Sequence, residues 1–119
     1  MASEELDKAI GAHGMWKTRL KQAIETGKSE VSVETIRQDN QCNFGKWLYG
    51  STLSAADKSS AQYKTVRELH AEFHKCAARV TDLAVTGSKG EADRMLAFGG
   101  EFTTVSSRLT AAMMEWKKV

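Results

Sequence analysis

The sequence predicts an all-α protein, an antiparallel four-helix bundle with three long helices and one short helix. Apolar residues recur every three or four positions over three long stretches, as they do along one face of an α-helix. Gly27, Gly50 and Gly87 follow the ends of helical patterns, where glycine commonly stops a helix. The 119-residue chain contains no proline, and its short connections suit antiparallel neighbours.

We expect the first helix to run roughly from Ser3 to Thr26. Ser3 is a suitable N-cap residue with two glutamates behind it, and Gly27 is the stop. His13 falls on the apolar stripe of this helix, so we expect its side chain to point inward. The stripe consists of Leu6, Ile10, His13, Trp16 or Lys17, Leu20, Ala23 and Ile24.

The second helix is expected to be short. It follows the polar linker GKSEVSVETIRQDNQ, in which VSVETI reads as a short turn or a strand-like piece. Asp39 and Asn40 are good capping residues, and Gly50 ends the helix. Cys42 is expected in the first turn, ahead of an apolar face made by Phe44, Trp47 and Leu48.

The third helix is expected from Ala55 or Lys58 to Thr86, and the fourth from Glu91 to Lys117. His70 lies on the stripe of the third helix, with His74 beside it. That stripe consists of Tyr63, Val66, His70, Phe73, Ala77, Val80 and Ala84. The stripe of the fourth helix consists of Met95, Phe98, Phe102, Val105, Leu109, Ala112 or Met113, and Trp116.

Length and composition indicate a single soluble domain over residues 1–119. The net charge is +2 and the basic residues are scattered among acidic ones, which gives no reason to expect a nucleic-acid partner. No apolar run is long enough to span a membrane, and no signal peptide opens the chain. The expected location is therefore the cytoplasm, where Cys42 and Cys76 are free thiols or metal ligands.

The three histidines give the main indication of what the protein binds. All three lie on or beside predicted core stripes, and His70 and His74 are one helical turn apart. A single buried histidine is usually a core residue bonded to a backbone carbonyl or a water, but each of three needs its own partner. A zinc ion satisfies them together, with His13, His70 and His74 as imidazole ligands and Cys42 as the thiolate. Cys76 lies about 200° around the helix from His74 and reads as a small packing residue.

The chain resembles the chemoreceptor zinc-binding domain family. The resemblance rests on KAIGAHGMW around His13, CNFGKWLYG opening at Cys42, and LHAEFHKC with His70 and His74. It implies that these three histidines and the cysteine are the zinc ligands. It further implies a cytosolic, dimeric four-helix bundle that regulates an attached output domain, as on chemotaxis receptors and diguanylate cyclases. In some relatives the zinc-bound cysteine is implicated in sensing hypochlorous acid.

The expected function is a non-enzymatic sensor or regulatory module, because a site with four protein ligands has no vacant position for a substrate. Gly45 is expected to allow a close approach near Cys42, and Trp16, Phe44 and Trp47 to wall the site or simply fill the core. Zinc is expected to hold Cys42 as a thiolate, which its position in the first turn of a helix also favours, and oxidants attack the thiolate. Loss of the bond between Cys42 and zinc, or a change in zinc occupancy, then frees the second helix and alters the bundle.

Three other functions remain open. A purely structural zinc-stabilised dimerisation module has the same site but no sensing role. A phosphotransfer bundle requires an exposed histidine, whereas periodicity buries His70. A di-iron bundle requires bridging carboxylates, and no Glu-x-x-His motif occurs. A homodimer is expected from the family resemblance and from apolar side positions on the fourth helix, unless these widen its core stripe; they are Met95, Leu96, Met113 and Met114.

Overall fold

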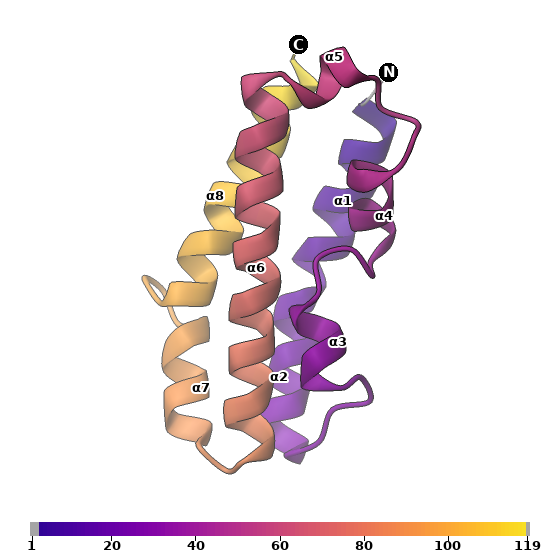
Figure 1. The fold of residues 1–119 in the computed structure, drawn as a ribbon. Helices are drawn as coiled ribbons and strands as arrows, with labels where there is room; N and C mark the ends of the chain where they lie inside the picture. The colour runs from indigo at the N-terminus through magenta and orange to yellow at the C-terminus, as the bar shows by residue number, and fades with distance from the viewer. Residues whose placement is uncertain (1–2, 119) are drawn as a thin grey trace.

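The computed structural model describes residues 3–118, and this part of the chain is helical with no strand. The predicted all-α class is confirmed (Figure 1). The helical segments are α1 (Ser3–Gly14), α2 (Trp16–Thr26), α3 (Val33–Arg37), α4 (Asn43–Tyr49), α5 (Ala55–Lys58), α6 (Ala61–Val85), α7 (Lys89–Leu96) and α8 (Glu101–Lys117).

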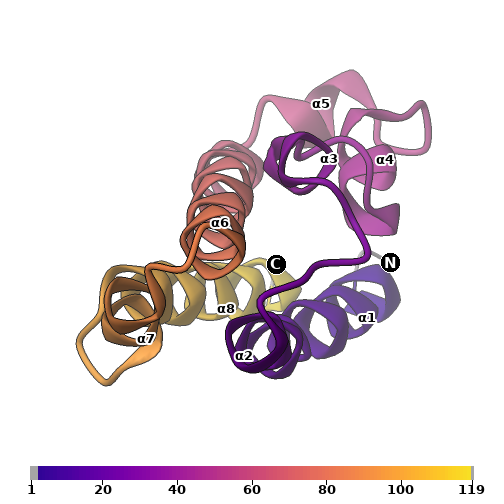
Figure 2. The same ribbon diagram turned by 90° about the horizontal axis from the view of Figure 1, so that it is seen from below.

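The helices form an elongated molecule whose longest dimension is 45 Å. α2 continues the direction of α1, α8 follows α7 in a second column, and α6 packs against both columns (Figures 1 and 2). The short helices α3 and α4 close the remaining side, so that the view from below shows helices around a common interior (Figure 2). His13 of α1 and the histidines His70 and His74 of α6 are buried in this interior.

Each of the three predicted long helices contains an interruption. Met15 separates α1 from α2, although its backbone stays right-handed and its N–H still bonds Gly11. Ser60 starts α6 anew, because its side chain accepts a hydrogen bond from the Tyr63 N–H.

The VSVETI segment contains the one-turn helix α3 capped by Ser32, so the strand-like interpretation is wrong. Periodicity alone did not reveal these local capping interactions.

The fourth predicted helix is broken between α7 and α8, and the prediction for Phe98 is wrong. Gly99 has a left-handed backbone with φ +80°, and a Cβ on Gly100 would lie 2.3 Å from the Arg94 carbonyl oxygen. This tight glycine turn resets the helical phase. Phe98 is therefore fully exposed, whereas Phe102 in the next turn is 1% exposed.

The apolar stripe predicted for residues 63–84 is buried throughout, with His70 at 0% exposure and His74 at 2%. Among the proposed dimer positions, Met95, Leu96 and Met113 are buried within the chain and Met114 is exposed. Three of these four side chains therefore belong to a wider core stripe. No described helix combines the length and the apolarity that crossing a bilayer requires.

The glycine turn gives a test of the boundary between α7 and α8. Phe98→Ser should change the free energy of unfolding by no more than about 0.5 kcal/mol, since the side chain is exposed. Phe102→Ala should cost about 3–5 kcal/mol, because it empties a buried aromatic site. Chemical denaturation of the two variants measures both values. A large loss for Phe98→Ser would mean that the helix continues through residue 98.

Candidate metal centre

Four potential metal ligands from three helical elements meet in the interior. His13 lies near the end of α1, Cys42 is the N-cap of α4, and His70 and His74 lie on adjacent turns of α6. One donor atom from each residue lies within 4.8 Å of the others. The structure thus brings together all four residues that the sequence singled out, with Cys42 one position before the predicted first turn.

Four of the six separations between the donor atoms match those around a tetrahedral ion. The Nε2 atom of His70 lies 3.1 Å from the Nε2 atoms of both His13 and His74. The Sγ atom of Cys42 lies 3.3 Å from His70 Nε2 and 3.5 Å from His74 Nε2. Zinc bond lengths place ligands about 3.3 Å apart for two nitrogens and about 3.6 Å apart for nitrogen and sulfur. One zinc ion fits between these four atoms.

Backbone carbonyls fix two of the rings. His13 Nδ1 donates to the Ala9 oxygen at 2.8 Å, and His74 Nδ1 donates to the Ile36 oxygen at 2.9 Å. The proton on Nδ1 leaves the Nε2 lone pair of each ring facing the centre. His70 Nε2 can share a proton with His13 Nε2 or with His74 Nε2, but not with both at once. The remaining Nε2 lone pairs face one another and repel unless a cation lies between them. The donor chemistry therefore fits a metal ion.

His70 differs from the other two histidines. Its Nδ1 atom is buried and has no hydrogen-bond partner among the described residues. A buried ring nitrogen without a partner costs free energy, which binding at Nε2 must offset. Sequence reasoning did not find this asymmetry, nor the two carbonyls. Ala9 is recognisable only as the residue one turn before His13, and no sequence signal points to Ile36.

Gly45 shapes the position of Cys42. The Gly45 N–H donates to Cys42 Sγ at 3.3 Å. A Cβ on Gly45 would lie 1.8 Å from the Asp39 carbonyl oxygen, so the close approach expected at this glycine is present. Tyr49 donates to the Asp39 side chain and ties the same loop to the end of α4. The loop before α4 therefore packs directly on the helix whose N-terminus presents the sulfur.

Aromatic rings enclose the cluster. The Phe44 ring meets the His70 ring edge-on at 5.1 Å between centroids, and Phe73 meets His13 at 5.0 Å. Trp47 stacks on Phe44 at 5.5 Å, and Trp16 approaches His74 at 6.3 Å. The expected aromatic wall is thus present. Phe73, which the sequence indicated only as a core residue, is part of it.

Burial sets the protonation of the metal-free site. It lowers the pKa of His13 to about 4 and that of His70 to about 2, and it also lowers the pKa of His74. Burial raises the pKa of the Cys42 thiol, and the hydrogen bond from Gly45 opposes this rise without cancelling it. The start of the helix favours the thiolate, as expected, but it does not outweigh the effect of burial. The thiolate depends on the bound cation.

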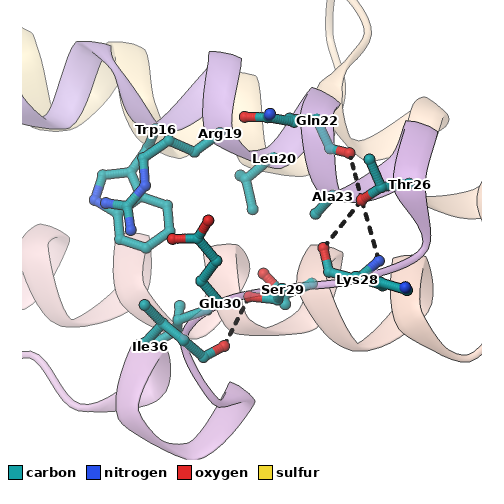
Figure 3. Close-up of a pocket in the computed structure, with 12 residues that line it drawn as sticks. Trp16, Arg19, Leu20, Gln22, Ala23, Thr26, Lys28, Ser29, Glu30 and Ile36 are labelled. Carbon is teal, nitrogen blue, oxygen red and sulfur yellow. Dashed lines mark hydrogen bonds between the residues drawn. The ribbon is translucent and has the colours of Figure 1, made fainter.

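A cavity of about 590 Å³ reaches the cluster between α1 and the loop before α4. Cys42 and His13 line its inner part, and Cys42 is the only half-buried member of the cluster. A second cavity of about 470 Å³ lies beyond Trp16 and Arg19, between α2 and the segment leading into α3 (Figure 3). Solvent thus reaches the sulfur more directly than it reaches the rings of His70 and His74.

Cys76 does not join the cluster. It is buried, and its thiol approaches the Glu101 carboxylate at 3.7 Å. Burial, followed by the charge of Glu101, raises the pKa of Cys76 to about 11. This protonated thiol fits the packing role expected from the sequence.

The family model of the chemoreceptor zinc-binding domain matches residues 13–81, which is more than half of the 119-residue chain. The matched segment begins at His13 and includes Cys42, His70 and His74. No curated protein and no solved structure gives a significant match to the chain.

The close approach at Gly45 should control metal affinity. Gly45→Ala forces the loop before α4 away from the helix, so zinc affinity should fall about 10–100-fold, as for other residues that orient a ligand. Gly11→Ala is the matched control, because a Cβ there meets nothing within 4 Å. Competition with a chromophoric chelator measures both affinities. Equal affinities for the two variants would contradict a positioning role for Gly45.

The lowered histidine pKa values predict the number of protons released by zinc at pH 6. Burial lowers the pKa of all three rings, so they should release few protons and the Cys42 thiol should account for about one proton per zinc. Ordinary histidine pKa values near 6.5 would add roughly two more protons. Calorimetric titration in buffers of different ionisation enthalpy gives this number, and Cys42→Ser should reduce it to about zero. Release of three protons would show that the rings are protonated before zinc binds.

Proposed function

The chain belongs to the chemoreceptor zinc-binding domain family, and we propose that it is a zinc-binding sensory domain of a bacterial signalling protein. His13, Cys42, His70 and His74 are the proposed ligands of one zinc ion. The observation that carries this proposal is the convergence of their four donor atoms within 4.8 Å of one another, with four of the six separations between 3.1 and 3.5 Å. Three neutral imidazoles and one thiolate are a ligand set that zinc favours.

We further propose that the whole chain acts as one unit, an antiparallel four-helix bundle in which the short helices form the fourth column. The arrangement of the columns in Figures 1 and 2 supports this description. The role is non-enzymatic, because four protein ligands complete the tetrahedron and leave no position for an activated water. Zinc bound there links α1, α4 and α6 and adds its binding energy to the ordering of these elements.

The proposed signal is a change at Cys42. This residue is the accessible member of the cluster, and the cavity beside it admits small oxidants from solvent. Zinc holds the sulfur as a thiolate, which hypochlorous acid converts to sulfenic acid. The oxidised sulfur is a poorer ligand, so α4 loses its tie to α6. Removal of zinc has the same consequence, so metal occupancy is the alternative stimulus.

An attached output domain reads this change in the proposed mechanism. A chemotaxis receptor or a diguanylate cyclase is the proposed kind of parent protein, with the domain on its cytoplasmic side. The proposed active form is a homodimer, as is typical of the family. Because Met95, Leu96 and Met113 are buried within the chain, the surface between copies must use other residues, such as the exposed Met114.

Metal analysis and controlled oxidation test the function. Mass spectrometry of the purified protein should find one zinc per chain. One equivalent of hypochlorous acid should release this zinc to a chromophoric chelator. Cys76→Ser should behave like the wild type, because its thiol lies outside the cluster.

Cys42→Ser should bind zinc at least about 10-fold more weakly and should not respond to the oxidant. In the full-length parent, the same variant should abolish the response to the oxidant while the protein stays folded. Protein without zinc would refute the proposal. Zinc that is present, together with unaltered signalling by Cys42→Ser, would instead assign a structural dimerisation role.

A further inference from the structure

Cys42 has no thiol partner of its own. The chain contains two cysteines, and neither forms a disulfide. Cys42 Sγ faces His70 on one side of α6, while Cys76 Sγ approaches Glu101 of α8. Cys76 is 7% exposed and packs toward α8, away from the cluster. A sulfenic acid at Cys42 therefore meets no second cysteine within this chain.

The cavity beside Cys42 has room for an external thiol. Its volume of about 590 Å³ lies within the range of about 300–1,000 Å³ typical of small-ligand pockets. Cys42 lies in its wall next to the side chains of Gln41 and Asn43, which offer hydrogen-bonding groups. The half-buried sulfur in the wall of this cavity is accessible to a small thiol.

The charges around the cavity favour an anionic thiol. Lys8 and Glu5 both line the cavity and pair with each other at 3.8 Å, so their charges largely cancel. Arg19 stacks on Trp16 at 4.1 Å, and no described carboxylate lies within salt-bridge distance of its guanidinium. Glu30 extends toward Arg19 only from the second cavity (Figure 3). Among the residues that line this cavity, Arg19 is thus the cation without an ion-pair partner.

We propose that oxidised Cys42 is capped by a small carboxylate-bearing thiol that enters this cavity and is oriented by Arg19. The proposal rests on the proposed function, because it requires oxidation of Cys42. The oxidant is hypochlorous acid or a peroxide; with the former, Cys–S⁻ and HOCl give Cys–SOH and Cl⁻. The entering thiolate attacks the sulfenic sulfur, forms the mixed disulfide and expels hydroxide. A second thiolate then attacks the disulfide and restores the Cys42 thiolate for zinc.

The experiment compares three small thiols on oxidised Cys76→Ser protein: 3-mercaptopropionate, 2-mercaptoethanol and cysteamine. Intact-mass spectrometry at timed intervals follows one adduct per chain, and rates are corrected for the thiolate fraction. We expect the anionic thiol to react fastest. Arg19→Gln should slow the anionic thiol about threefold and leave the neutral thiol unchanged, while Glu5→Gln should speed the anionic thiol. Arg108→Gln, an exposed site on α8 outside both cavities, is the matched control.

Four results would overturn the proposal. They are equal rates for the three thiols, no effect of Arg19→Gln, an intramolecular disulfide between Cys42 and Cys76 in the wild type, and disulfide-linked pairs of chains in place of adducts. A sulfenic-acid probe separates these failures from failure of the proposed function. A positive probe without capping refutes the capping proposal alone. No probe labelling at Cys42 refutes both the capping proposal and oxidation of Cys42 as the signal.

Discussion

The structure depends on one constraint, which is the need to satisfy three buried imidazoles and a thiol at a single point. His13, His70 and His74 lie at 6% exposure or less, and hydrogen bonds from Nδ1 orient two of the rings toward the centre. Such rings destabilise a small core unless their inward lone pairs have a common partner. A divalent cation is that partner. The same burial that makes the metal-free cluster costly keeps the histidines neutral and ready to bind.

The metal links features that would otherwise be separate. Ile36 of α3 orients His74, the loop at Asp39 packs against Gly45, and Gly45 in turn bonds the sulfur of Cys42. A change at the sulfur therefore acts on the short helices while α6 keeps its own packing. Because burial favours the thiol, the cation also determines when the sulfur becomes a nucleophile. In the proposed site, metal occupancy, proton release and reactivity toward oxidants are thereby coupled at one residue.

The sequence predicted the helical class, the inward histidines and the membership of the cluster, because spacing along a helix fixes which side chains share a face. It did not predict the exposed Phe98, because the turn at Gly99 and Gly100 depends on a local backbone contact rather than on periodicity. It also missed the carbonyls of Ala9 and Ile36, since a backbone oxygen leaves no sequence signal. The state of Cys42 required the three-dimensional burial, which outweighs the helix terminus.

The central claim is that one zinc ion is bound by one sulfur and three imidazole nitrogens. X-ray absorption at the zinc edge of the purified protein measures this ligand set directly. The account requires one sulfur at about 2.3 Å and three nitrogens at about 2.0 Å, with multiple-scattering features from the imidazole rings. In Cys42→Ser the sulfur shell should disappear while the imidazole features remain. A wild-type spectrum with two or more sulfurs, or with no sulfur at all, would contradict the account.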